Sequence, residues 1–336
     1  MSSVFRLTGG TFRDGVGKKY VAGDKVESDE DLDEKFPGQF ERLSGRPNTD
    51  RKGFGRTKLE AKQGEHGWEV INEASGRKLN DLPLTEEQAR SFMDDFGGAA
   101  KRFFHCPPIW RGTCFIIGGG PSLKGFKWQL LKGQRVIGCN DAYQLGSWVD
   151  VMHYGDEGWF DNWYKKKIGR ESLRKFPGLK TCSCVSHLHI PDVKVFRRLN
   201  HGIEGIESRW ELAWNQSTGA QAINLAILLG ARRIILLGFD MKPEGEDNNW
   251  HSNSIHKANP DVNARHLRYI KTFLMPGLLK LKEHPLYKDL EVLNVKTDPE
   301  SPLDCFPETN LKDELGISTK KAEAKTEPKK KSRRTK

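Results

Sequence analysis

The sequence predicts an α/β fold, a Rossmann-like and mainly parallel sheet with helices on both faces, preceded by small β-rich N-terminal modules. Two observations predict it. From residue 113 onward, short apolar segments alternate with longer segments of helical length. The short segments are mainly apolar, which is typical of parallel strands that are covered on both faces. Glycine or polar residues follow several of them, where such sheets bind their ligands.

The first 110 residues have a different pattern. Residues 1–48 are expected to form a small β-rich module, and residues 49–65, rich in Gly, Arg and Lys, a linker. Residues 66–110 are expected to form a hairpin and a short helix, which Thr85 and Gln88 begin as a capping box. Modules of this size bury little core, so we interpret them as attachments that dock a protein partner. The strands expected here are Val4–Leu7, Lys19–Val21, Lys25–Val26 and Trp68–Asn72.

A nucleotide-binding Rossmann-like domain is expected over residues 111–316, before a basic tail at 317–336. Its elements follow from the apolar runs and their lengths. The expected strands are Cys114–Ile117, Arg135–Cys139, Val149–Tyr154, Leu179–Val185, Arg233–Phe239 and Glu291–Val295. The expected helices are Ser122–Leu131, Trp159–Phe176, Thr218–Leu229 and Val262–His284.

The loop after the first of these strands is the strongest candidate for ligand binding. Gly118, Gly119 and Gly120 let the backbone approach a ligand closely. Pro121 suits the first turn of a helix, and Ser122 can cap it. Free N–H groups at a helix start attract an anion, most simply a phosphate. We therefore predict that this loop binds a nucleotide; the alternative is a tight turn without a ligand.

Other polar residues follow strands of the same predicted edge. Asn140 ends the second strand and either contacts a base or phosphate or caps a helix. Asp156 follows the third strand and either binds a metal or a sugar hydroxyl or caps the next helix. Ser217, Thr218 and Gly219 begin another predicted helix and are further candidates for nucleotide binding. Asp240, at the end of the last apolar strand, is the remaining candidate.

The polar segment 242–260 follows that last apolar strand and contains His251 and His256. Imidazole titrates near neutral pH, so a histidine above a ligand-binding edge is a candidate general base. A histidine in a loop is otherwise an ordinary surface residue.

The six cysteines lack the spacing of a disulfide framework, and we expect free thiols in a reducing compartment. Cys182, Cys184, His187 and His189 lie within eight residues, and zinc accepts these ligand types. Because Leu179–Val185 is expected to be a buried strand that hides the cysteines, we predict no bound metal.

The net charge of +10 is concentrated in one segment. Residues 318–336 hold seven Lys, two Arg and two Glu, which gives +7 and leaves +3 for the rest. This tail is expected to be disordered, and it either solubilises the chain or contacts nucleic acid by counterion release. No apolar run is long enough to span a membrane, and no secretory signal is recognised, so we expect a cytoplasmic protein.

Together these motifs resemble bacterial sialyltransferases of glycosyltransferase family 42. They are equally similar to proteins related to archaeal 6-hydroxymethylpterin pyrophosphokinase, many from bacteriophages, and a bacteriophage origin is expected. The resemblance spans about residues 112–315. The matching motifs are Gly-Gly-Gly-Pro-Ser-Leu, Cys139-Asn140-Asp141, Ser217-Thr218-Gly219, Leu236-Leu237-Gly238-Phe239-Asp240 and Ser301-Pro302-Leu303.

The resemblance implies a glycosyltransferase-like enzyme that uses a nucleotide-activated sugar without a cofactor. His256, with Asp261 five residues further on, would be the general base. Residues 118–122, Asn140 and residues 217–219 would hold the nucleotide. The pyrophosphokinase relatives imply the alternative of an ATP-dependent phosphotransferase that needs Mg²⁺, with Asp156 as its acidic residue. A third alternative is a nucleotide-binding phage assembly protein without catalysis. The acceptor stays open between a saccharide, a protein side chain and DNA.

Overall fold

The computed structural model describes most of the Rossmann-like domain and parts of the N-terminal region. The described residues are 3–7, 11–13, 18–28, 32, 40–44, 59–73, 75–97, 103–188, 190, 192–199, 202–203, 206, 208–247, 249–251, 260–296 and 298–317. The predicted basic tail, from residue 318, lies outside them, and so do His189 and His256.

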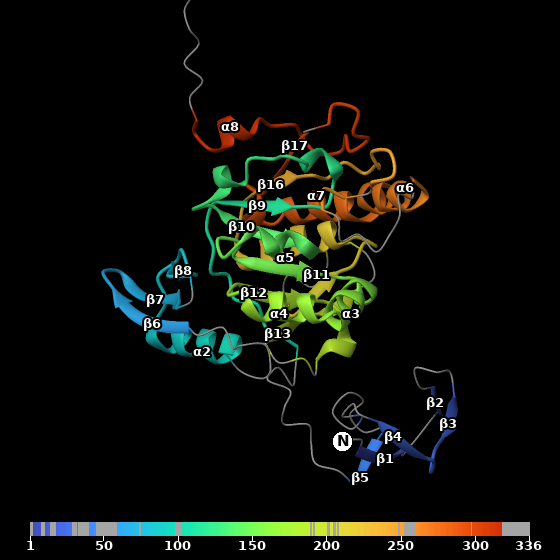
Figure 1. Cartoon of the computed structure of the whole chain (residues 1–336). Coiled ribbons are helices and arrows are strands. Elements are labelled where there is room, and N and C mark those ends of the chain that lie inside the picture. The colour runs from blue at the N-terminus through green and yellow to red at the C-terminus, as the bar shows by residue number, and fades with distance from the viewer. Residues whose placement is uncertain are drawn as a thin grey trace, which may run out of the picture.

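A seven-stranded parallel sheet forms the centre of the molecule, in the order β13-β12-β11-β10-β9-β16-β17 (Figure 1). The chain begins in the middle at β9, runs outward strand by strand to β13, and returns to β16 on the other side of β9. The strands are β9 (Thr113–Ile117), β10 (Arg135–Cys139), β11 (Val151–Tyr154), β12 (Leu179–Cys182), β13 (Val193–Val195), β16 (Arg233–Leu237) and β17 (Glu291–Val295).

Helices cover both faces of this sheet, as predicted. Alternate side chains of each strand point to opposite faces, so Ile116 packs on one side and Phe115 on the other. The first face packs against α5 (Thr218–Leu229), whose residues 220–229 are all buried. The second face packs against α3 (Glu157–Lys165) and α4 (Lys167–Lys175). Both faces of the sheet are therefore core, which explains why its strands are mainly apolar.

Three predicted helices differ from those observed. After Pro121 the chain forms two short 3₁₀ segments, η1 (Pro121–Leu123) and η2 (Trp128–Leu131), because Gly125 has a φ of +72° and ends the turn between them. The second predicted helix is divided into α3 and α4 by Lys166, whose backbone is extended. The last is continuous but contains a π-helical turn, η5 (Ile270–Leu274), between α6 (Pro260–Tyr269) and α7 (Met275–Lys282).

Residues 59–97 form a small antiparallel sheet with one helix. Its strands are β6 (Leu59–Gly64), β7 (Gly67–Asn72) and β8 (Arg77–Lys78), and its helix is α2 (Glu86–Gly97). The predicted capping box is confirmed, because the Thr85 N–H donates to Gln88 Oε1 (2.9 Å) and the Gln88 N–H donates to Thr85 Oγ1 (3.2 Å). Residues 59–64 were expected in the linker, yet they pair with β7 along their whole length.

This second module shares its core with the domain instead of forming a separate one. Its buried side chains, among them Val70, Leu79 and Phe92, belong to the same cluster as α5 and the first face of the sheet. The Trp110 Nε1–H donates to the Leu79 carbonyl (3.1 Å), which fixes the chain where it enters β9. Packing against the large domain supplies the apolar burial that the module lacks by itself.

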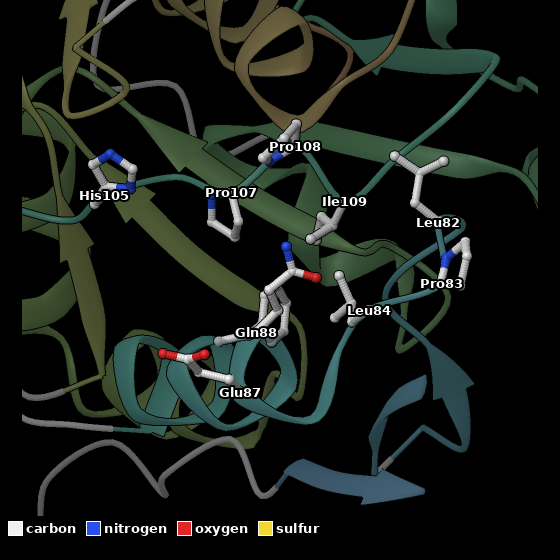
Figure 2. Close-up of a pocket in the computed structure, with 10 residues that line it drawn as sticks. Leu82, Pro83, Leu84, Glu87, Gln88, His105, Pro107, Pro108 and Ile109 are labelled. Atoms are coloured by element: carbon white, nitrogen blue, oxygen red, sulfur yellow. The ribbon is translucent and has the colours of Figure 1, made fainter. Parts of the chain in front are cut away.

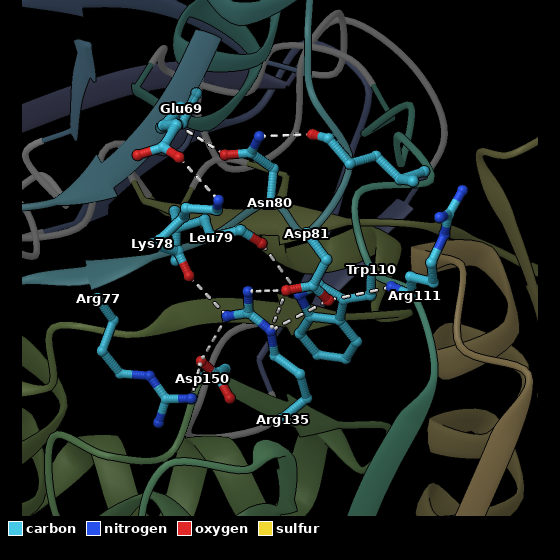
Figure 3. Close-up of polar contacts among 12 residues, drawn as sticks. Glu69, Arg77, Lys78, Leu79, Asn80, Asp81, Trp110, Arg111, Arg135 and Asp150 are labelled. Carbon is cyan, nitrogen blue, oxygen red and sulfur yellow. Dashed lines mark hydrogen bonds and ion pairs between the residues drawn. The ribbon is translucent and has the colours of Figure 1, made fainter. Parts of the chain in front are cut away.

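Charged side chains around the buried Asp150 join the module to the amino ends of β10 and β11 (Figure 3). Asp150, just before β11, lies 3.1 Å from the Arg77 guanidinium and 3.5 Å from that of Arg135. Its other carboxylate oxygen accepts from the Val136 N–H (2.8 Å). Arg135 also pairs with Asp81 and donates to the Lys78 carbonyl (2.6 Å). The amino edge of the sheet is thus closed by the module.

The first module is a set of short strands with a small core of its own, drawn apart from the central sheet in Figure 1. Phe5 and Phe40 meet edge to face at 6.4 Å in that core. The strands are β1 (Ser3–Leu7), β2 (Thr11–Arg13), β3 (Lys19–Val21), β4 (Lys25–Ser28) and β5 (Phe40–Ser44). Three short strands of the domain were not predicted: the edge strand β13, and β14 (Arg197–Leu199) with β15 (Glu211–Ala213), which pair with each other. The final helix is α8 (Leu311–Glu314).

Candidate functional site

The candidate site lies at the carboxyl ends of β9 and β16, where the order of the strands reverses. The chain leaves β9 toward β10 on one side and leaves β16 toward β17 on the other. In open α/β sheets, such a reversal is where ligands bind, because the two loops diverge. Here the loops are bonded at their base: the Gly118 N–H donates to the Leu237 carbonyl and the Gly120 N–H to the Gly238 carbonyl, both at 2.8 Å.

Ser122 and Asp240 connect the two loops further out. The Ser122 hydroxyl donates to Asp240 Oδ1 (2.6 Å), and its N–H donates to Oδ2 (2.8 Å). Asp240 is only 4% exposed. Burial raises the pKa of its carboxyl above the ordinary value, and the two bonds from Ser122 oppose that rise. The hydrogen bonds from Ser122 therefore stabilise the buried carboxylate in place of water.

These bonds change the interpretation of the glycine loop. The loop has four N–H groups, and those of Gly118, Gly120 and Ser122 donate to protein oxygens. Within the described part of the chain, the Gly119 N–H is the one that has no acceptor. The short 3₁₀ turn that follows supplies no helix dipole of the predicted kind. An anion held only by free amides at a helix start is thus not the arrangement that this structure has.

The segment 249–251 packs across the glycine loop. The Trp250 N–H donates to the Gly119 carbonyl, and its indole N–H donates to the Gly118 carbonyl, both at 2.9 Å. A Cβ atom on Gly119 would overlap Asn249 Oδ1, so a larger residue here would displace the Asn249 side chain. Trp250 also packs on Trp128 with ring centroids 5.0 Å apart. The glycine loop therefore positions the residue that follows Trp250.

That residue is His251, which lies over the carboxyl end of β10. Its Nδ1 atom is 3.5 Å from Asp141 Oδ2 but forms no hydrogen bond with any described residue. Burial lowers the pKa of His251 below its ordinary value, and the negative charge of Asp141 opposes this. Asp141 is 1% exposed and accepts from the Trp159 indole N–H (2.8 Å) and from Gln144 Nε2 (2.6 Å). The imidazole is thus neutral near pH 7 and faces a fixed carboxylate.

Asn140 is the second group at this position with an unused polar atom. Its backbone has a φ of +51°, a left-handed conformation that asparagine tolerates better than most residues. Its Oδ1 atom is buried and has no hydrogen-bond donor within the described part of the chain. An unsatisfied buried oxygen costs about 1–3 kcal/mol, which a ligand that donates to it would recover.

Residues 217–219 come to the same place through Phe239. A Cβ atom on Gly219 would lie 2.6 Å from the Phe239 ring, and one on Gly118 would lie 3.1 Å from it, so the ring fills the space between the two glycines. Ser217 is the N-cap of α5, since its side chain accepts from the Ala220 N–H (3.3 Å). Thr218 is the first residue of that helix. This helix start lies beside the glycine loop, as predicted.

Asp156 serves as a helix cap, one of its two predicted roles. Its Oδ1 atom accepts from the Gly158 N–H (2.8 Å) at the start of α3. The segment with His256 lies outside the described residues. Asp141, Asn249 and Trp250 were not singled out by the sequence, although the Asn140-Asp141 pair after a strand and the Trp250-His251 pair are both visible in it.

A cavity of about 430 Å³ lies elsewhere, between α2 and the segment that enters β9 (Figure 2). Its wall is mainly apolar, with Pro107, Pro108 and Ile109 on one side and Leu82 and Leu84 on the other. None of the predicted site residues lines it. It belongs to the junction between the second module and the domain.

Solved structures of similar topology include glycosyltransferases. Sialyltransferase CstII from Campylobacter jejuni, in complex with a substrate analogue, cytidine-5'-monophosphate, is 18% identical over 58% of this chain and 84% of its own, with a TM-score of 0.36. Sialyltransferase Cst-I from the same organism is 20% identical over 59% and 80%, with a TM-score of 0.38. The MAf glycosyltransferase from Magnetospirillum magneticum is 14% identical over 58% of this chain and 32% of its own, with a TM-score of 0.34.

No protein-family description and no curated protein matches the chain. The identities and scores of the solved structures do not assign an activity, so the function rests on this chain's own residues. Among the helices that the structure describes, none has the length and apolar character needed to cross a bilayer.

Proposed function

We propose that the chain is a glycosyltransferase-like enzyme that binds a nucleotide-activated sugar at the carboxyl edge of β9, β10 and β16. One observation carries this proposal: Asn140 Oδ1 and His251 Nδ1 are both buried and form no hydrogen bond with any described residue. Asn140 directly precedes Asp141 in the sequence, and His251 faces the Asp141 carboxylate. Buried polar atoms in native proteins are otherwise nearly always satisfied. Two at one sheet edge support a site that a ligand completes.

His251 is the general base in this proposal. A base must be unprotonated before the reaction, and burial of the imidazole favours the neutral form. His251 takes the proton from an acceptor hydroxyl as the acceptor oxygen forms a bond to the anomeric carbon. The bond from that carbon to the phosphate oxygen breaks, and the nucleotide leaves with the electron pair. Asp141 then stabilises the imidazolium, the role of the carboxylate in a His–Asp pair.

The predicted base, His256, remains the alternative within the same loop, because it lies outside the described residues. Asn140, the Gly119 amide and the start of α5 would contact the nucleotide. Ser122 and Asp240 would hold the two loops at the spacing that the nucleotide needs, since both carboxylate oxygens of Asp240 are already bonded to Ser122.

The ATP-dependent phosphotransferase is supported less well by the carboxylates at this edge. Mg²⁺ is bound through carboxylate oxygens together with substrate phosphates. The Asp156 carboxylate caps α3, and Asp240 accepts two bonds from Ser122. A magnesium site would require either of them to give up these bonds. Binding of a nucleotide without turnover would leave His251 without a role.

The proposal is tested first by binding. Thermal unfolding is followed with CMP, UDP, GDP and ATP, each with and without Mg²⁺, because a ligand that binds the folded state raises the unfolding temperature. We expect a rise with a pyrimidine nucleotide that does not depend on Mg²⁺. A rise with ATP only in the presence of Mg²⁺ would favour the phosphotransferase, and no rise with any nucleotide would contradict a nucleotide site.

Turnover is tested next, as release of nucleotide from the nucleotide-sugar that binds. His251→Ala should lower the rate by on the order of 10²- to 10⁴-fold while nucleotide binding persists. His66→Ala, a change of the exposed histidine between β6 and β7, is the matched control and should retain the rate. If His256→Ala abolishes turnover and His251→Ala does not, the base is His256.

A further inference from the structure

A second cluster of reactive side chains lies two strands away from the proposed site, at the carboxyl end of β12. Cys182 is the last residue of that strand, and Cys184 and His187 follow in a 3₁₀ turn, η4 (Val185–His187). The ligand atoms of the three side chains all lie within 4.8 Å of one another. All three are buried, with exposures of 0%, 1% and 4%.

The expectation of a buried strand through Val185 was wrong in its extent. β12 ends at Cys182, so Cys184 lies in the loop that follows the strand and not on the strand itself. The chain turns after Cys184 and brings His187 back to both sulfurs. Both cysteines are buried, as expected, but the turn gathers a third ligand beside them, which a strand through Val185 would not have done.

We propose that Cys182, Cys184 and His187 bind a zinc ion that fixes the turn after β12. Tetrahedral zinc with bonds of about 2.3 Å to sulfur and 2.0–2.1 Å to nitrogen places its ligand atoms about 3.5–3.8 Å apart. The three atoms are already close to that spacing, so small side-chain rotations complete the site. The fourth ligand is solvent or Asp161, which is half exposed.

The surroundings of the cluster suit a metal-bound histidine. The Tyr154 hydroxyl lies 3.0 Å from His187 Nδ1, and Asp161 Oδ1 lies 3.7 Å from Nε2. Whichever ring nitrogen binds zinc, the other keeps a polar neighbour, and such partners orient the ring of metal-bound histidines. The Phe160 ring packs on His187 with centroids 4.6 Å apart and limits access of water.

The charges around the sulfurs are also balanced. Arg198 Nη2 lies 3.4 Å from Cys184 Sγ, and the same nitrogen donates to the Gly155 carbonyl (2.6 Å). Two thiolates neutralise Zn²⁺, and Arg198 with Asp161 adds one charge of each sign. Through Arg198, the metal would also fix the loop after β11. We therefore assign the ion a structural role.

The test uses the full chain without a histidine tag, purified with a reductant, incubated with ZnCl₂ and desalted. Mass spectrometry of the metal should find about one equivalent of zinc per chain. Cys182→Ser/Cys184→Ser should reduce this at least about tenfold. Cys106→Ala/Cys114→Ala, which alters two buried cysteines outside the cluster, is the matched control and should keep the zinc.

A spectroscopic measurement keeps the test decisive if the double variant does not fold. Co²⁺ added to the wild-type chain should give the thiolate-to-cobalt charge-transfer band and the intense visible bands of a tetrahedral site, and Zn²⁺ should displace them. Wild-type protein that retains neither zinc nor cobalt overturns the proposal. Loss of zinc in the Cys106/Cys114 control to the same degree as in the cluster variant also overturns it.

Discussion

The two edges of the central sheet treat buried polar groups in opposite ways. At the amino edge, Asp150 Oδ2 accepts from the Val136 N–H, and Asp150 Oδ1, which has no hydrogen bond of its own, is compensated by the positive charges of Arg77 and Arg135 at 3.1 and 3.5 Å. At the carboxyl edge, Asn140 Oδ1 and His251 Nδ1 are buried without a hydrogen bond to any described residue. One edge is closed by protein, and the other is left incomplete.

This difference indicates what each edge is for. A buried polar group without a partner lowers stability, so folding alone would favour its replacement. The amino edge satisfies its charges with the second module and thereby holds that module in place. At the carboxyl edge, the unpaired polar atoms lower the stability of the fold at the place where the loops diverge. We infer that a ligand supplies the missing hydrogen-bond partners.

Asp150→Ala, at the amino edge, should have the largest effect, which is a loss of stability. This change leaves Arg77 and Arg135 without their shared partner in a mostly buried position, and we expect a loss of about 3 kcal/mol in the free energy of unfolding. Burial raises the pKa of Asp150 to about 6, which means that ionisation of this carboxyl lowers the stability of the folded chain, so the loss measured by urea unfolding should be larger near pH 5 than near pH 8.

The control for this change is Lys78→Ala, which breaks the exposed pair with Glu69 (2.8 Å) in the same module. Exposed pairs contribute at most about 1 kcal/mol, so its effect should be much smaller. Nucleotide binding should survive both variants. An Asp150→Ala chain as stable as the Lys78→Ala chain would show that the amino-edge charges do not hold the module.

A smaller effect is expected at the carboxyl edge from Gly120→Ala. The new Cβ would lie 2.6 Å from the Gly238 carbonyl and overlap the Asp240 carboxylate, so the two loops must move apart. We expect a loss of about 1–3 kcal/mol in stability and nucleotide affinity at least about tenfold weaker, measured by urea unfolding and thermal shift.

Gly125→Ala is the matched change. Its φ of +72° makes alanine unfavourable by about 1–2 kcal/mol, but no atom lies within 4 Å of the added Cβ. Gly125→Ala should lower the free energy of unfolding but should bind the nucleotide with the same affinity as the wild type. Equal affinity in Gly120→Ala and wild type would remove the glycine loop from the binding site.

The smallest expected effect is on the pH dependence of turnover. Because burial lowers the pKa of His251 below its ordinary value, the neutral base persists to mildly acidic pH, and activity falls only as the pH drops through that lowered pKa. Asp141→Asn removes the charge that opposes this shift, so the acidic limb of the pH profile should move to still lower pH. An acidic limb that moves upward in Asp141→Asn would exclude the pairing of His251 with Asp141.

The sequence by itself determined the sheet and much of its chemistry. Apolar runs predicted β9, β10 and β17 to within a residue, and the mainly apolar segment 218–229 forms α5 with the predicted bounds. Because all strands of a parallel sheet run in the same direction, their carboxyl ends lie at one edge. The residues after β9, β10 and β16 could therefore be predicted to lie together.

Only the tertiary structure decided how those residues are used. Ser122 donates to Asp240 across 118 positions of the chain, which removes amides that local sequence left free. Asn249 above Gly119 and His251 beside Asp141 depend on how a polar loop folds back over the sheet. Such contacts arise from the packing of distant segments, and no local pattern of residues encodes which partner a polar group will meet.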